Sequence, residues 1–360
     1  FNDADVQIGS DNEIAGLLRL NQPLYTGGLV RGALQSARSQ VTATEEAERQ
    51  LRQAIIAQVE TALYDYLLAA EIVRVRTLAL QRARSNERQV DALRQAGRVT
   101  RFEWTRATVQ IAVAESDSIE STHDLTLASL DLKDVVGMEL SQEVTVEGSF
   151  RDTSNLASSR SVQDAIEEAL QRRPEPRQLR AIAESYVGEE RVAQSGTRPR
   201  LDLVAVGQMQ FQDDALDGVG SAEDWRRSWS TGLMLEVPLF DGMRTRARVA
   251  QAREARRRVQ LEAEQLDRAI EREVYRAWLE VSEARQRLRA RQGSVGQARL
   301  GLEDADARYQ KGAGTQLEVL DAHLTLVQAE SEYARVRRDQ SVALVALERA
   351  IGVLGEDVRN

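Results

Sequence analysis

Val237-Pro238-Leu239-Phe240-Asp241-Gly242 repeats, at an offset of 238 − 23 = 215, the earlier stretch Gln22-Pro23-Leu24-Tyr25-Thr26-Gly27. The same offset aligns many further pairs of identical residues. They are Arg31 with Arg246, Ile55 with Ile270, Val59 with Val274, Ala62 with Ala277, Gly97 with Gly312, Thr100 with Thr315, Ala107 with Ala322, and Gly137 with Gly352. An ungapped match over such a length indicates that the chain is a tandem duplication.

Before each of these two corners, apolar and polar residues alternate. This alternation predicts strands over 13–22, 199–212 and 228–238, and its period and length are typical of transmembrane β-strands. The residues that share the more apolar face are Ile14, Gly16, Leu18 and Leu20, then Leu201, Leu203, Ala205, Gly207, Met209 and Phe211, then Trp229, Thr231, Leu233, Leu235 and Val237. The acidic, glycine-bearing stretch 213–226 predicts an exposed loop. Because the second repeat shows two strands and the first only one, we expect the N-terminal part of the first repeat to lie upstream of Phe1.

After each corner, the spacing of apolar residues predicts a long helix and an antiparallel return helix. The seam residues recur every three or four positions, as in a coiled coil. They are Leu51, Ile55, Val59, Ala62, Tyr66, Ala69 and Val73 in the first repeat, and Val259, Ala263, Leu266, Ile270, Val274, Ala277, Val281, Ala284 and Leu288 in the second. At 1.5 Å per residue, each long helix reaches roughly 100 Å. Gly97 and Gly312 are placed to end the long helices, and Thr100 and Thr315 to cap the return helices.

These elements predict a mainly α fold with a transmembrane β part, organised in two repeats. The first repeat covers 1–137, with long helix 28–96 and return helix 100–137. The second covers 176–352, with a short helix 176–196, long helix 243–311 and return helix 315–352. An irregular inter-repeat segment covers 138–175, and a tail covers 353–360.

The composition excludes several classes of function. The chain has 360 residues, no cysteine and a net charge of −9. It therefore has no disulfide, thiolate zinc site or cysteine nucleophile, and its acidic balance argues against nucleic-acid binding. His123 and His323 are isolated on helices, and the Gly312-Ala-Gly314 stretch lacks the third glycine of a dinucleotide site. We find no catalytic constellation, metal site or cofactor site, so the chain is not predicted to be an enzyme.

Strands and long helices in one chain predict an assembly. A long helical hairpin must pack sideways on other helices, and amphipathic strands in a bilayer must close into a barrel. One copy supplies too few strands to enclose a space, whereas a symmetric oligomer satisfies both requirements.

The duplicated pattern resembles the TolC family of outer-membrane efflux proteins. The resemblance rests on the Pro-Leu-aromatic-x-Gly corners, on Ala169–Glu175, on Tyr309-Gln-Lys-Gly-Ala-Gly-Thr315, on Leu317–Ala322 and on the terminal Ile351-Gly352. It covers nearly the whole chain. It implies a homotrimer in the outer membrane of a Gram-negative bacterium, with a twelve-stranded β-barrel above a twelve-helix α-barrel in the periplasm. Residues 138–175 would form part of an equatorial collar.

The resemblance also implies a function and its partners. The protein would be the passive exit duct of a tripartite efflux or type I secretion system, in contact with outer-membrane lipid. A periplasmic adaptor would dock on the hairpin turns, and an inner-membrane transporter would supply the energy. The turn residues are Gly97, Thr100, Gly312, Gly314 and Thr315, and the strand-to-helix corners are Pro23, Gly27, Pro238 and Gly242. The alternative is a soluble periplasmic coiled-coil adaptor or scaffold, which would have similar helices but no need for the alternating strands.

The family match implies a periplasmic gate at the hairpin tips. Its gate acids correspond to Glu318 and Asp321, its tip tyrosine to Tyr309, and its first-hairpin acid to Glu103. The turn arginine of the family's archetype is replaced by Gly314, and Arg98, Arg101 and Arg106 on the first hairpin could supply a substitute cation.

Two pairs of residues, the gate acids and the two tryptophans near the predicted membrane interface, also have a purely structural interpretation. Glu318 and Asp321 share one helix face, and three-fold symmetry would gather their carboxylates near an axis, where they would favour cations. They could equally be ordinary acids that complement the dipole at a helix start. Trp225 and Trp229 lie where an aromatic girdle is expected at the membrane interface, the alternative being ordinary strand packing.

Overall fold

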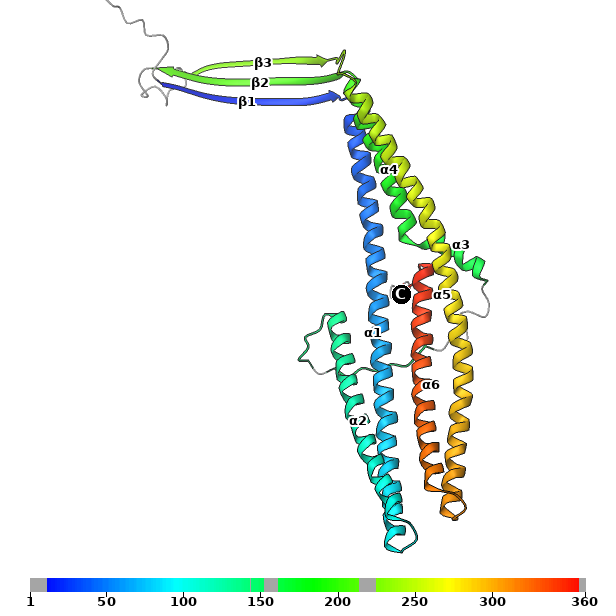
Figure 1. Ribbon diagram of the computed structural model, residues 1–360. Helices are drawn as coiled ribbons and strands as arrows, with labels where there is room; N and C mark the ends of the chain where they lie inside the picture. The colour runs from blue at the N-terminus through cyan, green and yellow to red at the C-terminus, as the bar shows by residue number, and fades with distance from the viewer. Residues whose placement is uncertain (1–11, 143, 152–160, 214–224, 356–360) are drawn as a thin grey trace, which may run out of the picture. The chain divides into compact units, whose positions relative to one another are not determined.

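The computed structural model describes residues 12–142, 144–151, 161–213 and 225–355. Figure 1 shows the elements in chain order. They are β1 (Asn12–Tyr25), α1 (Leu29–Gln95), α2 (Arg101–Val136), α3 (Val162–Arg172), α4 (Pro174–Gln194), the 3₁₀ turn η1 (Ser195–Thr197), β2 (Arg200–Asp213), β3 (Trp225–Glu236), α5 (Arg244–Gln310) and α6 (Gln316–Ile351). Most of the loop predicted over 213–226 and the end of the predicted tail lie outside the described residues.

The chain forms two compact units. One, the strand unit, contains the residues up to Glu45 together with Arg177–Ala263. The other, the hairpin unit, contains Glu46–Pro176 and the residues from Glu264 onwards. Among the described helices, none has a stretch that is long and apolar enough to cross a membrane.

In the strand unit, the three strands form one antiparallel sheet in the order β1-β2-β3. Leu18 pairs with Gly207, which in turn pairs with Trp229. In a sheet, residues that pair directly point to the same face. The apolar sets predicted for the three strands therefore lie on one common face of the sheet.

The strand ends differ from the predicted ones. β1 continues to Tyr25 and includes Pro23, beyond the predicted end at residue 22. Pro23 lacks a donor, which an edge strand tolerates, and the register shifts between Pro23 and Tyr25. β3 begins at Trp225 rather than at residue 228, because Trp225 pairs with Phe211 and their rings lie 5.7 Å apart.

Short side chains let the helices of the strand unit approach closely. A Cβ atom added to Gly32 in α1 would lie 2.7 Å from the carbonyl oxygen of Gly188 in α4. From the other side, Arg253 in α5 donates from Nε to Oε1 of Glu190 in α4, at 2.7 Å. Helix α4 thus contacts both long helices within this unit.

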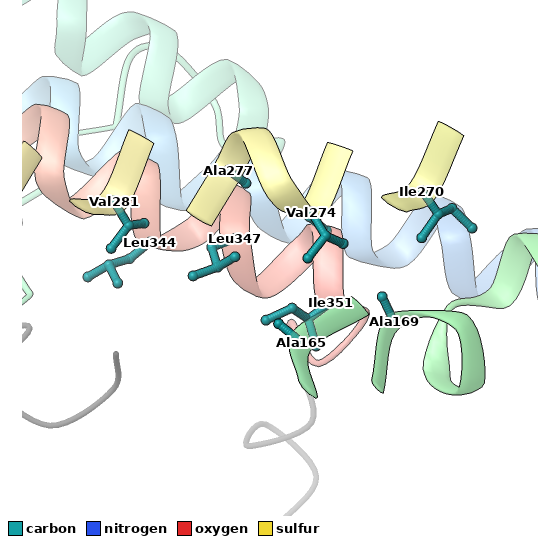
Figure 2. Close-up of a cluster of buried hydrophobic side chains, with 10 residues drawn as sticks. Ala165, Ala169, Ile270, Val274, Ala277, Val281, Leu344, Leu347 and Ile351 are labelled. Atoms are coloured by element: carbon teal, nitrogen blue, oxygen red, sulfur yellow. The ribbon is translucent and has the colours of Figure 1, made fainter. Parts of the chain in front are cut away.

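In the hairpin unit, the second repeat packs as predicted. Figure 2 shows its core, in which α5, α6 and α3 meet. The buried residues are Ile270, Val274, Ala277 and Val281 of α5, Leu344, Leu347, Ala350 and Ile351 of α6, and Ala165 and Ala169 of α3. The seam predicted for the second long helix is confirmed at these α5 positions.

The seam predicted for the first long helix is half-buried in a single copy of the chain, except at its first two residues, which are exposed. Leu51 and Ile55 of α1 are 61% and 47% exposed. Another face of α1 is covered instead, since Ala57 and Tyr64 pack with Val345 and Leu354. Helix α6 thus packs on the face of α1 that carries Ala57 and Tyr64, and not on the face that has the most regular apolar spacing.

The segment 138–175 is more regular than the sequence analysis expected, because it contains α3. A capping box begins this helix: Asp164 N–H donates to Ser161 Oγ, and Ser161 N–H donates to Asp164 Oδ2. A serine followed three residues later by an acid, as at Ser161 and Asp164, already indicates the start of a helix in the sequence.

The stretch before α3 is fixed by residues 150 and 151. The ring of Phe150 stacks on that of Tyr64, with centroids 6.3 Å apart. Arg151 donates to Glu348 in α6 at 2.6 Å and to Glu60 in α1 at 3.2 Å. This stretch therefore ties α1 to α6.

Candidate gate at the hairpin tips

The first hairpin turn joins α1 to α2 through a left-handed glycine. Gly97 has φ +70°, and Arg98 N–H donates to the carbonyl oxygen of Leu93 at 2.9 Å. Thr100 then caps α2 in a capping box with Glu103, whose Oε2 accepts from Thr100 N–H at 2.7 Å. The Glu103 carboxylate is therefore engaged by the turn of its own hairpin.

The second hairpin turn has the same construction. Gly312 has φ +72°, and Ala313 N–H donates to the carbonyl oxygen of Arg308 at 2.9 Å. Thr315 caps α6, because its Oγ1 accepts from Glu318 N–H at 3.3 Å. A Cβ atom on Gly314 would lie 3.2 Å from Arg308 Cβ, Tyr309 N and Glu318 Oε2. A larger residue at position 314 would therefore require these neighbouring atoms of the turn to move.

The two hairpins touch at their tips through a residue that the sequence analysis did not select. Gln316, only 2% exposed, donates from Nε2 to the carbonyl oxygen of Glu103 at 3.0 Å. Tyr309 lies at the same place: burial raises the pKa of its hydroxyl, and the nearby Glu103 charge raises it further. Within the described residues, Tyr309 OH and Gln316 Oε1 are both buried without a hydrogen-bond partner.

The acids Glu318 and Asp321 lie on α6, just above the second turn. Glu318 pairs with Arg308 of its own hairpin, with Nη2 and Oε2 3.8 Å apart. Both side chains line an open groove of about 790 Å³ along α5 and α6, whose lining includes the small residues Gly301 and Ala322. Asp321 forms no ion pair with any described residue.

The first-hairpin arginines that could supply a closing cation form no ion pair within one copy of the described chain. Arg98 and Arg101 are exposed, and neither forms an ion pair within the described chain. Arg106 lies over the ring of Phe102, at 5.8 Å from its centroid. Within one copy of the chain, the cation near Glu318 is Arg308 of the same hairpin. A closing cation from the first hairpin stays a prediction.

Further up the hairpins, one carboxylate contacts two arginines from different helices. Glu330 of α6 lies 4.0 Å from Arg82 of α1 and 3.4 Å from Arg299 of α5. His323 is also on this side of α6, and burial lowers the pKa of its imidazole. Arg82 to Glu330 is thus a second polar link between the two hairpins.

The strand-to-helix corners are built alike in both repeats. Gly27 has φ +63° and Gly242 has φ +67°, each following the Pro-Leu-aromatic sequence of Pro23 or Pro238. Thr26 Oγ1 accepts from Val30 N–H, and at the repeated position Asp241 Oδ2 accepts from Thr245 N–H at 2.8 Å. These side chains cap α1 and α5.

The repeats, the sheet with one apolar face and the paired hairpins agree with a comparison of the sequence with known families. A family model described as "Outer membrane efflux protein" matches residues 4–138 and 165–353. This chain belongs to that family.

Individual relatives of this efflux protein match most of the chain. The pyoverdine export outer membrane protein OpmQ of Pseudomonas putida is 26% identical over 335 residues, which cover 89% of this chain and 67% of that protein. The outer membrane protein OprJ of Pseudomonas aeruginosa is 26% identical over 366 residues, which cover 97% and 73%.

Solved structures share the fold at lower identity. A crystal structure of CusC has a TM-score of 0.78 at 21% identity, and covers 94% of this chain and 78% of its own. The outer-membrane channel OprN has a TM-score of 0.74 at 21% identity, and covers 95% and 81%.

Family membership confirms the resemblance seen in the sequence and the mainly α fold with a β part. The protein is an outer-membrane efflux channel of a Gram-negative bacterium, and a passive duct rather than an enzyme. Channels of this kind work with a periplasmic adaptor and an inner-membrane transporter. The relatives named above are outer-membrane proteins, so the soluble adaptor or scaffold alternative finds no support.

Proposed function

We propose that this efflux channel is a homotrimer, closed at its periplasmic end by the hairpin tips and opened when they separate. The contact from Gln316 Nε2 to the Glu103 carbonyl oxygen is the observation that carries this proposal, because it ties the two hairpins where the gate is expected. Two neighbouring buried polar atoms, Tyr309 OH and Gln316 Oε1, lack partners in the described residues. Within one copy, such atoms cost free energy and lower the stability of the closed tip.

The exposed apolar sheet face supports a trimeric β-barrel. Leu18, Trp229 and Leu233 on that face are 78%, 81% and 66% exposed. Lipid can cover such a face, but the unpaired sheet edges must close on further strands. Three copies with four strands each would make the twelve-stranded barrel that the family implies. Trp225 and Trp229 would then belong to its aromatic girdle.

The uncovered seam of α1 supports a second contact between copies. Leu51 and Ile55 keep the spacing of a coiled-coil seam, although no described part of the same chain covers them well. A neighbouring copy that packs on this seam would complete the twelve-helix barrel.

Cation preference at the gate would come from Glu318 and Asp321. Three-fold symmetry would bring their carboxylates together around one axis, where their potentials add. Arg308 partly offsets Glu318, so Asp321 would contribute more of the field.

The adaptor would dock on the turns and the groove beside them. Gly97, Thr100, Gly312, Gly314 and Thr315 shape the turns, and the groove of about 790 Å³ between α5 and α6 starts directly above the second one. A helical hairpin fits an elongated groove with small residues in its lining. Docking there would separate the tips and break the Gln316 contact.

Single-channel recording in planar bilayers tests the gate. Replacing Glu318 and Asp321 with Ala lowers the cation selectivity of the full-length protein, seen as a reversal potential closer to zero in a salt gradient. The matched control replaces Glu280 and Glu283 with Ala, since these are two exposed α5 acids with the same spacing. An unchanged reversal potential in the Glu318/Asp321 variant refutes the acidic gate.

A further inference from the structure

We propose that the corner between β1 and α1 binds the phosphate group of an anionic phospholipid. An open groove of about 710 Å³ lies at this corner, entirely within the strand unit. Its lining comes from the end of β1, the start of α1, the last turn of α4, and Arg198, which follows the 3₁₀ turn η1. The proposal uses the outer-membrane location of the protein, and it does not depend on the gate.

One wall of the groove carries three guanidinium groups, those of Arg31, Arg191 and Arg198. Arg191 donates from Nη1 to Gln35 Oε1 at 2.6 Å, and Arg198 donates to Gln194 Oε1 at 3.2 Å. Within the described residues, none of the three pairs with a carboxylate. The two acceptor amides donate in turn to Glu184 and Glu190, so carboxylates lie behind these glutamines but do not contact the three guanidinium groups directly. The guanidinium groups therefore keep donors free for an anion in the groove.

The backbone of the corner is shaped to receive Arg198. Its Nη1 donates to the carbonyl oxygen of Gly27 at 3.1 Å. A Cβ atom on Gly27 would lie 2.7 Å from Arg198 Cβ, and one on Gly28 would lie 3.2 Å from Arg198 Nη1. Two glycines in succession therefore let this guanidinium lie against the start of α1, whose dipole also favours an anion.

Apolar side chains from the end of β1 and the start of α1 form a further wall of the groove. Leu24, Tyr25 and Val30 are 54%, 52% and 53% exposed, and all three line the groove. Leu20, 59% exposed, continues this apolar surface along β1. A cationic wall beside an apolar one fits a molecule that carries both a phosphate and an acyl chain.

This combination favours a membrane lipid over free phosphate. Free phosphate would use the arginines alone and would leave the apolar wall in contact with water. The groove lining contains no carboxylate that could receive an ammonium group, so an anionic headgroup fits better than a zwitterionic one.

Native mass spectrometry of the detergent-purified, full-length protein tests the site. Phosphatidylglycerol and phosphatidylethanolamine with identical acyl chains are titrated separately, and bound lipids are counted on the intact oligomer. Phosphatidylglycerol binds more tightly, and replacing Arg31 or Arg191 with Gln weakens its binding about fivefold for each arginine lost. The matched control is Arg257→Gln, which removes an exposed α5 charge outside the groove and leaves the binding unchanged.

Three outcomes overturn the proposal. They are equal binding of the two lipids, equal weakening by Arg257→Gln, and an inorganic phosphate affinity as high as that of phosphatidylglycerol. The last result would make the groove a site for free anions. The oligomer mass in the same spectra shows that each variant has assembled.

Discussion

Gln316, at the first position of α6, donates a hydrogen bond from Nε2 to the backbone carbonyl oxygen of Glu103 in α2, at 3.0 Å. The two residues are 213 positions apart in the sequence, and they join the tip of one hairpin to the tip of the other. A side chain donates here to a backbone oxygen, so the contact survives any change of the Glu103 side chain that preserves the turn. The link therefore depends on Gln316 more than on the acid that the family resemblance singles out.

Replacing Gln316 with Ala therefore favours the open tip. The loss of one hydrogen bond costs the closed form about 1 kcal/mol per copy, which is roughly a fivefold change for each copy and more than about a hundredfold for a trimer whose three tips open together. Single-channel recording would show a higher open probability. Gln292→Ala, at an exposed α5 position outside the groove, is the control and leaves the open probability unchanged. Equal behaviour of the two variants would contradict the role of Gln316.

Arg308→Gln tests the balance of charge beside the gate. Arg308 and Glu318 are 3.8 Å apart and about half exposed, so the ion pair adds little stability, but it offsets one acidic charge in each copy. The variant has a higher cation selectivity than the parent channel, measured by the reversal potential at low ionic strength. Arg289→Gln, at an exposed α5 position far from the turn, serves as the control. A decrease in selectivity would show that Arg308 does not offset the gate acids.

The repeat and the cap residues made much of the fold predictable. The long helices observed at 29–95 and 244–310 differ by one residue at each end from the predicted ranges. Their ends follow from local chemistry, because a left-handed glycine stops a helix and a threonine starts the next one. The α3 helix was missed although Ser161 and Asp164 signalled its start, because the surrounding segment looked irregular.

The site was less predictable, since its contacts depend on which faces meet in space. Gln316 has no local signal, because its partner is a distant backbone oxygen. Arg308 was overlooked as the partner of Glu318, since the resemblance directed attention to the first hairpin. The groove arginines Arg31, Arg191 and Arg198 come from two separate segments, and only folding brings them together.

Met243→Gly is expected to stabilise the corner before α5. Met243 has φ +66°, a left-handed conformation that costs an L-residue with a side chain about 1–2 kcal/mol, and the equivalent residue in the first repeat is Gly28. Glycine removes this cost but makes the unfolded chain more flexible, which leaves a net gain of about 0.5–1 kcal/mol. Thermal unfolding in detergent, followed by circular dichroism, measures the difference.

Gly27→Ala, at the corner before α1, and Gly242→Ala, at the corner before α5, are controls with the opposite expected effect on stability. Both force alanine into a left-handed conformation, and both lower the unfolding temperature. The Gly27 variant loses more, because its Cβ atom would lie 2.7 Å from Arg198 Cβ, whereas a Cβ atom on Gly242 meets no described atom within 4 Å. A Met243→Gly variant that unfolds earlier than the parent would contradict the strain at this position.

Ile55 and Ile270 occupy the same position in the two repeats. Substituting Ile270 tests the stability of a single copy, whereas substituting Ile55 tests the stability of the trimer. Ile270 is 1% exposed in the core of the hairpin unit, so Ile270→Ala costs about 2–5 kcal/mol of folding free energy. Ile55 is 47% exposed, and its replacement weakens the trimer if a neighbouring copy covers the seam of α1. Trimer dissociation on heating in detergent measures the second effect. Normal trimer stability in Ile55→Ala would remove the α1 seam from the contact between copies.

Acid lowers the stability of the hairpin unit through Glu175. Burial opposes the ionised carboxylate, but the hydrogen bonds and charge of Arg173, with Nη2 and Oε1 2.7 Å apart, outweigh it and hold the pKa of Glu175 below its ordinary value of 4.5. The ionised pair therefore stabilises the fold above about pH 4.5, and this contribution is lost as the pH falls through the lowered pKa of the folded state.

Glu175→Gln unfolds at a lower temperature than the parent at pH 7, and this gap between the two unfolding temperatures narrows as the pH falls below 4.5. Glu280→Gln, at an exposed α5 position, is the control and unfolds like the parent at both pH values. A gap of constant size would mean that Glu175 acts through its shape and hydrogen bonds rather than through its charge.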